Sequence, residues 1–427
     1  MSEEKFIFTA GAKKKLIIML VVGVVLTVLG IVMANSGGHG HEEVAAAAGH
    51  GADATHGGGH GGGAGWLKRL YTSLWINNVY FVGLALVGVL FVALQYVTQA
   101  GWSAPIKRVP EAFGYWLPIG GVLMIVTFLV ANHDLFHWTH EYLYDKASPE
   151  YDSILDNKKA YLNFGFFLGR TVVYFVVWTL LFFLIRKYSL LEDKVGGTEP
   201  WYKIRKYSVI FVVFFGVTSS TSAWDWVMSV DPHWFSTLFG WYVFSSYFVA
   251  GLAGITFLVL KLKDYGYLKV VKADHIHDMG KFVFGFSVFW TYLWFSQFLL
   301  YYYSNIPEET IYYVDRLVND HYSPYFLSLV FINFVIPFFV LMTRDSKRQG
   351  AILKIACIVI LIGHWLDFFM MITPGIMKNE GSIGFMEVGV TLVYLSAFLF
   401  VALTQLSKAG LVAHKHPMMK EAMHHHI

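Results

Sequence analysis

Ionisable residues are scarce in the apolar stretches of this 427-residue chain, and those present there have side chains that could move protons or bind a polar group. His364 and Asp367 are three residues apart, so on a helix they share a face, where the carboxylate would orient the imidazole. Arg170 is a lone basic residue within another apolar run, and Asp134, Asp225 or Asp367 could pair with it. Charged groups are costly at membrane depth and usually mark a function. We leave open whether Arg170 acts in a site or joins two helices.

A second group of candidates lies between His133 and Glu141. His133, His137 and His140 recur at helical spacing, so one helix face could present three imidazoles beside the carboxylate of Glu141. Such a face could pass protons or bind a metal, because imidazole titrates near neutral pH. It could equally be a helix end that caps the surface beneath a partner subunit. All candidates for a proton path or quinol pocket are His133, Asp134, His137, His140, Glu141, Arg170, Asp225, His364 and Asp367.

The elements that position these residues follow from composition. Hydrophobic residues make up 56% of the chain and charged residues 14%, whereas a soluble domain has about a quarter of its residues charged. The net charge is only +3, with basic residues spread among loops, so nothing indicates nucleic-acid binding. The single cysteine, Cys357, excludes an internal disulfide, a covalently attached c-type haem and a cysteine-held iron–sulfur cluster. A redox group in this chain would have to be a quinone or a haem held by histidines.

Ten apolar runs reach the roughly 20 residues that a helix needs to cross a bilayer. They predict an all-α integral membrane protein with about ten transmembrane helices. The first run is too long for the apolar part of a signal peptide, so we expect an uncleaved helix. The fifth run is the shortest. The runs are 16–34, 76–98, 115–135, 163–185, 207–223, 238–260, 282–303, 325–343, 352–372 and 385–407.

Charge orients these helices. With the N-terminus inside, the inner segments hold 24 Lys and Arg residues and the outer segments hold seven. By the positive-inside rule both termini face the cytoplasm. The ionisable residues at membrane depth then fall in the outer half, and the inner half is expected to hold little beyond scattered Thr, Ser and Gln. These outer residues are His133, Asp134, Arg170, Asp225, His364, Asp367 and Glu387.

Two segments are rich in histidine. Residues 36–65 form a Gly-, Ala- and His-rich linker, which we interpret as a flexible outer connector, because its histidines lack the regular spacing of metal ligands. The chain ends in His424-His425-His426, and the sequence leaves open whether this run is native or a cloning remnant. The linker histidines are His39, His41, His50, His56 and His60.

Three stretches resemble a known family. They are SAWDWVMSVDPHW over 222–234, FSQF over 295–298 leading to YSNIPEET over 303–310, and GHW over 363–365. Together with ten helices, they resemble the F subunit of bacterial alternative complex III, a quinol:cytochrome c oxidoreductase. The resemblance covers most of the chain after residue 70.

The resemblance implies a polysulfide-reductase-type membrane subunit of the bacterial inner membrane, whose core is two four-helix bundles formed by helices two to five and six to nine. The chain would then divide into 1–35, a linker over 36–75, bundles over 76–235 and 236–375, and a last helix and tail over 376–427. It would carry no covalently bound cofactor, and menaquinol or ubiquinol would be the quinol. Iron–sulfur clusters and haems would lie in partners, which are an iron–sulfur protein, multihaem and monohaem cytochromes c and a homologous C subunit, with a terminal oxidase as a further candidate. Proton translocation through the outer-face residues would be a second role.

Two alternatives stay open. His133 and His364 could clamp one haem, as in a b-type cytochrome. Two bundles could also form the repeats of a secondary transporter, although the ionisable residues lie off-centre rather than at the midplane. The aromatic loop 226–234, which carries no Lys or Arg, is our expected docking surface for an outer subunit.

Overall fold

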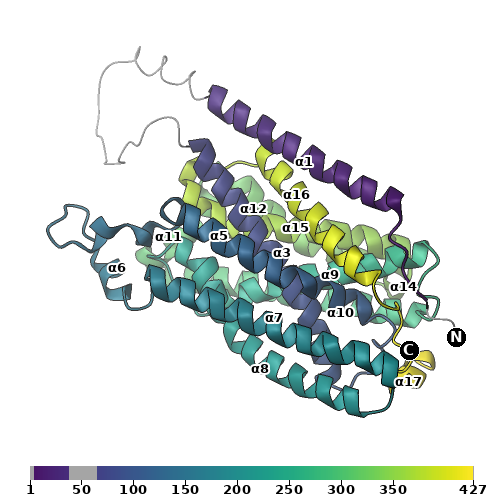
Figure 1. Cartoon of the computed structure of the whole chain (residues 1–427). Helices are drawn as coiled ribbons and strands as arrows, with labels where there is room; N and C mark the ends of the chain where they lie inside the picture. The colour runs from purple at the N-terminus through teal and green to yellow at the C-terminus, as the bar shows by residue number, and fades with distance from the viewer. Residues whose placement is uncertain (1–3, 38–64, 427) are drawn as a thin grey trace.

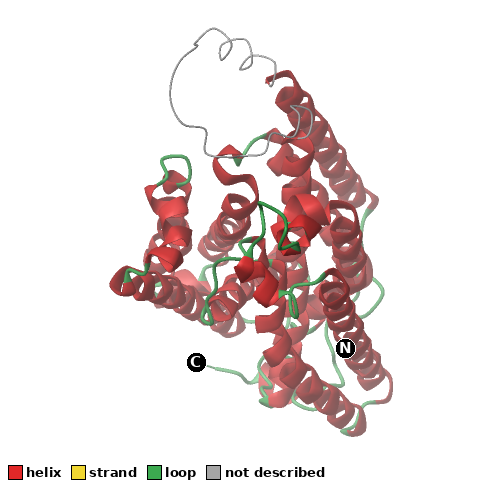
Figure 2. Cartoon of the chain, turned by 90° about the vertical axis from the view of Figure 1, so that its left-hand side faces the viewer, coloured by secondary structure: helices red, strands yellow, loops and turns green. Residues whose placement is uncertain are grey.

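The structure is a computed structural model that describes residues 4–37 and 65–426. Within these ranges the chain forms helices and loops, with no β-strand (Figure 2). Ten helical spans are long and apolar enough to cross a membrane. The prediction of an all-α protein with about ten transmembrane helices is confirmed. Most of the His-rich linker, including its five histidines, lies outside the described residues.

Eight of the spans form two rings of four. Bundle 1 consists of α3 (Gly65–Val97), α5 (Leu117–Leu135), α7 (Phe164–Val195) and α8 (Glu199–Trp226), and each helix packs on two others of the ring. Bundle 2 consists of α9 (Phe239–Asp264), α10 (Ala273–Ser304), the eighth span and α15 (Gly350–Met377), in the same arrangement. The bundles join where α3 packs on α9, and these two helices are the most buried spans.

The eighth span is interrupted. It consists of α12 (Ser323–Val330), the π-helical turn η6 (Phe331–Val335) and α13 (Ile336–Leu341). A second π-helical turn, η5 (Val314–Val318), follows α11 (Pro307–Tyr313) just before this span. Single π-turns inside helices are rare and frequently mark functional sites. The shorter elements are α4 (Arg108–Phe113), η1 (Gly114–Trp116), η2 (His137–Thr139), η3 (Glu141–Tyr144), α6 (Ser153–Lys158), η4 (Met228–Val230), α14 (Arg344–Arg348), η7 (Lys378–Glu380) and α17 (Met419–Met423).

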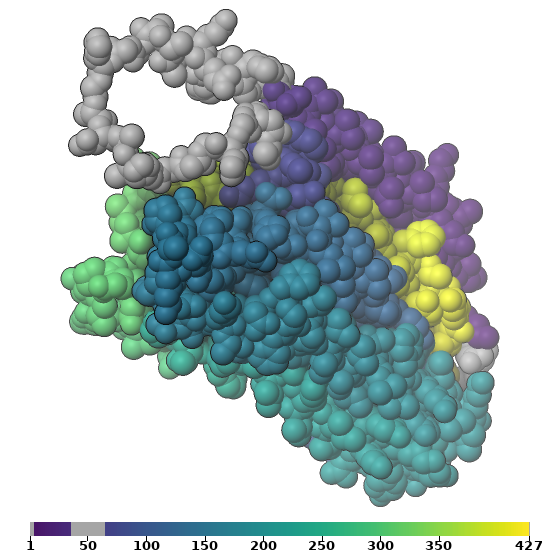
Figure 3. All heavy atoms as spheres, turned by 60° about the vertical axis from the view of Figure 1, so that its left-hand side comes forward, coloured from purple at the N-terminus to yellow at the C-terminus, as the bar shows by residue number. Residues whose placement is uncertain are grey.

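The first and last spans lie outside the two bundles. Helix α1 (Ala10–Gly37) runs along the edge of the molecule and packs chiefly on α16 (Phe385–Leu406) (Figures 1 and 3). Small residues allow this contact, since a Cβ atom added at Gly389 would lie 2.5 Å from the backbone nitrogen of Thr27. Most other side chains of α1 are exposed and apolar, as expected for a helix that faces lipid.

Both termini lie at one end of the helices, which we name the terminus end (Figure 1). The linker joins α1 to α3 at the other end, which we name the linker end. The helices extend beyond the predicted runs: α7 reaches Val195 rather than 185, and residues 65–75, expected in the linker, begin α3. The fifth span has 32 residues, and the shortest span within the described ranges is the eighth, with 19. The run that ends at 185 stopped before Arg186, but that residue continues α7.

Candidate functional site

The stretch from His133 to Glu141 does not form one helix. Helix α5 ends at Leu135, and Phe136 adopts an extended conformation before η2 begins. The expectation of a continuous helical face is therefore wrong. The turn nevertheless gathers the imidazoles, with ring centroids 5.1 Å apart for His133 and His140 and 5.8 Å apart for His137 and His140. No group of three metal-ligating side chains is found among the described residues. The histidines lie at the surface of the linker end, as a polar cap would.

Arg170 pairs with Asp225, one of its three predicted partners. Its Nε and Nη2 atoms donate to the two carboxylate oxygens at 2.9 and 2.8 Å, which is the strong bidentate arrangement. Asp225 is fully buried, and Tyr174 donates a further hydrogen bond to it at 3.2 Å. The guanidinium also stacks on the ring of Tyr161 at 3.9 Å. The ion pair between Arg170 and Asp225 therefore joins α7 to α8 near the linker end.

Asp367 lies in the interior of bundle 2. It is fully buried and accepts hydrogen bonds from the hydroxyl of Tyr242 on α9 and from Nε1 of Trp290 on α10, the latter at 2.8 Å. The Nδ1 atom of His364 lies 3.8 Å from its carboxylate and 3.1 Å from the hydroxyl oxygen of Ser246. The shared face predicted for His364 and Asp367 is confirmed. The carboxylate is thus held by neutral donors from two other helices.

An aromatic pocket, which the sequence analysis missed, lies beside Asp367. Gln297 is 1% exposed, and neither its amide nitrogen nor its amide oxygen has a hydrogen-bond partner in the described part of the chain. An unsatisfied buried amide is costly, so this side chain would gain from a polar partner, such as an internal water or a ligand. Tyr242 belongs to both the pocket wall and the Asp367 cluster. The lining residues are Tyr242, Trp294, Gln297, Tyr312, Tyr313, Arg316, Phe326, Leu329, Met370 and Met371.

Arg316 lines the same pocket, although the sequence analysis counted it among the outer loop residues. It is 1% exposed, and its guanidinium lies 3.4 Å from the ring centre of Tyr312. It donates to the backbone oxygens of Met370 and Met371 on α15, at 2.9 and 3.2 Å. Pro374 has no N–H to offer the oxygen of Met370, so that acceptor is open to Arg316. Backbone dipoles therefore hold this buried charge at the pocket.

Most of the loop between the fifth and sixth spans packs within this chain, and its expected role as a docking surface stays a prediction. Trp226 and Trp234 are 4% and 2% exposed. The indole of Trp234 stacks on Tyr312 with ring centroids 4.1 Å apart, and its Nε1 donates to the backbone oxygen of Glu309. Large aromatic rings gain more from burial than from display at a surface. The loop closes the linker end of bundle 2 over the pocket wall.

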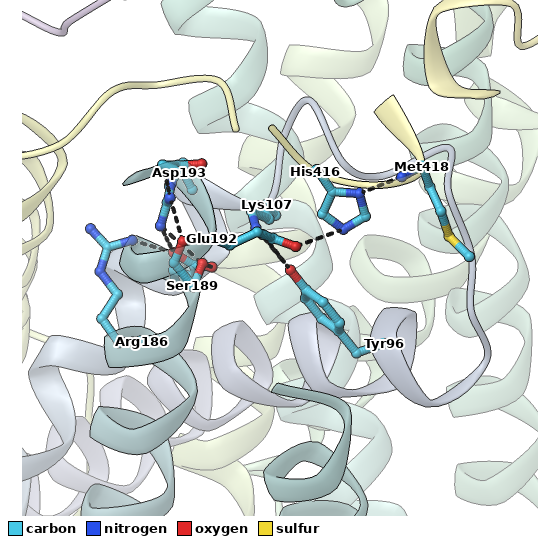
Figure 4. Close-up of polar contacts among 10 residues, drawn as sticks. Tyr96, Lys107, Arg186, Ser189, Glu192, Asp193, His416 and Met418 are labelled. Carbon is cyan, nitrogen blue, oxygen red and sulfur yellow. Dashed lines mark hydrogen bonds and ion pairs between the residues drawn. The ribbon is translucent and has the colours of Figure 1, made fainter. Parts of the chain in front are cut away.

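A network of buried charges at the terminus end of bundle 1 contradicts the expectation of a nearly apolar inner half (Figure 4). Glu111 is 2% exposed and accepts from Arg108 at 2.8 Å, from Ser189 at 2.5 Å and from Arg186. Arg108 also pairs with Asp193 at the end of α7. From the sequence these residues look like charges in solvated loops. In the structure they form ion pairs at the buried ends of α4 and α7.

The second half of this network lies beneath the C-terminal tail. Glu192 is fully buried, and its Oε2 atom accepts from the ammonium of Lys107 and from the hydroxyl of Tyr96. His416 of the tail places its Nε2 atom 4.0 Å from Oε1 of Glu192 (Figure 4). Burial, aided by the charge of Lys107, lowers the pKa of His416 to about 3. His416 is therefore neutral at physiological pH.

The fold and these buried polar clusters define a class, a multi-pass α-helical membrane protein with two four-helix bundles. No protein-family model matches the sequence, and no curated protein matches it. The clusters themselves therefore carry the information about function.

Proposed function

We propose that this chain is a membrane subunit of a quinol:cytochrome c oxidoreductase, as its resemblance to the F subunit of alternative complex III implies, and that the aromatic pocket of bundle 2 receives the quinol head group. The observation that carries the proposal is Gln297, whose two amide atoms lack partners in an otherwise aromatic pocket. A flat ring bearing polar oxygens on its edge would satisfy both at once. Under this proposal the terminus end faces the bacterial cytoplasm.

The lining residues have the chemistry of a site for such a head group, and the space among them, which holds about one water, would have to widen to admit the ring. Trp294 and Phe326 offer flat apolar surface, and their rings lie 5.2 Å apart. Gln297 can donate to one oxygen and accept from a hydroxyl, since its amide does both. The positive charge of Arg316 favours an electron-rich oxygen over a cation. Few polar groups placed within a mostly aromatic wall are typical of sites for small flat molecules.

The cluster behind the pocket supports a role in proton release. Oxidation of a quinol to a quinone releases two electrons and two protons. The electrons would pass to centres in partner subunits. Tyr242 lines the pocket and donates to Asp367, so a single hydroxyl joins the pocket to a buried carboxylate. Asp367 in turn faces His364, and both residues lie in the half of α15 toward the linker end. These side chains would hold a proton on its way to that side of the membrane.

The test is quinone binding to the full-length protein in lipid nanodiscs, measured by calorimetry with a short-chain ubiquinone analogue. Gln297→Leu removes both amide atoms at similar volume, and we expect roughly tenfold weaker binding, because about 1.4 kcal/mol of hydrogen bonding is lost. Gln405→Leu is the matched control, since it makes the same change on α16, away from the pocket. Equal affinity of wild type and Gln297→Leu would contradict the proposal.

Purification in mild detergent tests the complex itself. We expect the chain to co-purify with c-type haem and iron–sulfur proteins, and to lack a Soret band once separated from them. The haem-b alternative needs His133 and His364 at one iron, but His133 is exposed at the end of α5, whereas His364 is buried among α9, α10 and α15. A colourless chain recovered alone would instead favour a transporter.

A further inference from the structure

Two buried glutamates at the terminus end of bundle 1 have unequal surroundings. Both carboxylate oxygens of Glu111 accept hydrogen bonds, from two arginines and a serine. Glu192 accepts only at Oε2, while its Oε1 atom has no hydrogen-bond partner among the described residues. Leaving a carboxylate oxygen buried and unpaired is costly. A proton on Oε1 removes that cost, while Oε2 still accepts from Lys107 and Tyr96. The asymmetry therefore points to Glu192 as the residue that gains and loses a proton.

The position of Glu192 on its helix points the same way. It lies in the last turn of α7, where the backbone carbonyls disfavour a negative charge. Glu111 lies in the first turn of α4, where the helix terminus favours one. Local backbone electrostatics thus stabilise the ionised form of Glu111 and the neutral form of Glu192.

A small pocket lies next to the residues that contact this glutamate. Tyr96, Lys107 and His416, all of which surround Glu192, line it. Gln95 also lines it, and the Oε1 atom of Gln95 is a second buried acceptor with no partner in the described ranges. Polar atoms of this kind are the partners that an internal water needs. The roof of the pocket comes from His416 and Met418 of the C-terminal tail.

The tautomer of His416 suits this arrangement. Its Nδ1 atom accepts a hydrogen bond from the backbone N–H of Met418 at 3.1 Å, so we assign the ring proton of the neutral imidazole to Nε2. That N–H lies toward Oε1 of Glu192, at a distance suited to a bridging water. The other charged or titratable groups around Glu192 are Tyr96 of α3, Lys107 before α4, Arg108 and Glu111 of α4, and Asp193 of α7.

We propose that Glu192 carries an exchangeable proton, taken up from the solution at the terminus end through this pocket, whereas Glu111 stays ionised as an anchor. The site lies in bundle 1 and opens at the end of the molecule opposite to the Asp367 cluster. It does not depend on quinol binding, so it stands or falls separately from the proposed function.

The experiment is an infrared pH titration of the full-length protein in vesicles, following the carbonyl band of protonated carboxyl groups. The sequence has 29 Asp and Glu residues, so each variant is read as a difference from wild type. We expect Glu192→Gln to lose one titrating carboxyl band and Glu111→Gln to lose none. Size-exclusion profiles and helical circular dichroism confirm that each variant is folded.

Glu192→Asp keeps the test decisive if Glu192→Gln fails to fold. The shorter side chain retains a carboxyl group but moves it, so its band should shift in frequency or midpoint rather than vanish. A Glu192→Gln or Glu192→Asp titration that superimposes on wild type would overturn the proposal. Loss of a band in Glu111→Gln, with none lost in Glu192→Gln, would overturn it too and assign the proton to Glu111.

Discussion

Bundle 1 buries Glu111 between two arginines at the ends of its helices, whereas bundle 2 buries Asp367 among a tyrosine, a tryptophan and a histidine in its interior. Opposite charges cancel within the first cluster. In the second, the buried cation Arg316 is held by backbone oxygens of Tyr312, Met370 and Met371 rather than placed against the carboxylate. Buried acidic and basic side chains therefore neutralise each other in bundle 1, whereas in bundle 2 they stay apart.

We infer that the two clusters have different roles, one structural and one in proton transfer. Breaking one side of a compensated pair leaves a buried charge, so such a network resists change and fixes helix positions. A carboxylate held by neutral donors can accept a proton without stranding a cation beside it. The terminus-end network therefore fixes the helix ends of bundle 1, and Glu192 is its under-bonded glutamate. Under the proposed function, the Asp367 cluster is the place where bundle 2 changes protonation.

The largest effect should follow from removing the anchor. Glu111→Ala leaves Arg108 and Arg186 without their shared carboxylate, and we expect a loss of about 3–5 kcal/mol in the free energy of unfolding. Denaturant unfolding in detergent, followed by circular dichroism, measures it. Glu199→Ala breaks an exposed pair with Lys203 and should change stability little. Equal losses in both variants would show that the network is no anchor.

A smaller loss is expected at the linker end, where Arg170→Ala strands the buried Asp225. Since the guanidinium of Arg170 reaches solvent, we expect about 3 kcal/mol. Adding Asp225→Asn should restore part of that stability, because the stranded charge is gone. The double-mutant cycle, measured by the same unfolding assay, isolates the pair. If the second substitution only adds to the loss, charge compensation is not what holds α7 to α8.

Asp367→Asn sharpens the comparison because it should separate activity from stability. Trp290 can still donate to the amide oxygen, and the hydroxyl of Tyr242 can accept from the amide nitrogen, so unfolding should change far less than in Glu111→Ala. In the assembled complex we expect quinol-dependent cytochrome c reduction to fall about 100-fold, the scale of a lost proton acceptor. Asp225→Asn serves as the control carboxylate. Unchanged turnover and proton-to-electron stoichiometry in Asp367→Asn would remove this residue from the proposed function.

The sequence predicted those features that depend on spacing along one helix or on hydropathy. The ten spans, the shared face of His364 and Asp367, and the pairing of Arg170 with a carboxylate were all accessible in this way. The terminus-end network was not, because Lys107, Arg108 and Glu192 stand at the edges of apolar runs, where they look like solvated loop charges. Their burial follows from the side-chain contacts between α4 and α7, which only the folded chain shows.

The pocket was missed for a related reason. Gln297 belongs to the FSQF stretch over 295–298, but nothing in one sequence shows that its amide would be buried without a partner. Arg316 follows a short helix in what looks like an outer loop, and its burial depends on backbone acceptors of α15, one of which Pro374 leaves open. Such features arise from contacts between distant segments, so periodicity carries no signal for them.

The most local of the expected effects concerns the C-terminal tail over the network. Burial lowers the pKa of His416 to about 3, compared with 6.5 for an exposed histidine, so the docked tail binds fewer protons than the free tail below pH 6.5. Docking should weaken as the pH falls from 6.5 toward 3, by at most about 1.4 kcal/mol per pH unit. Hydrogen exchange of residues 407–426, corrected for intrinsic rates, should show this loss. His416→Leu should abolish the dependence, whereas the control His424→Leu should retain it. An unchanged pH profile in His416→Leu would mean that other groups release the tail.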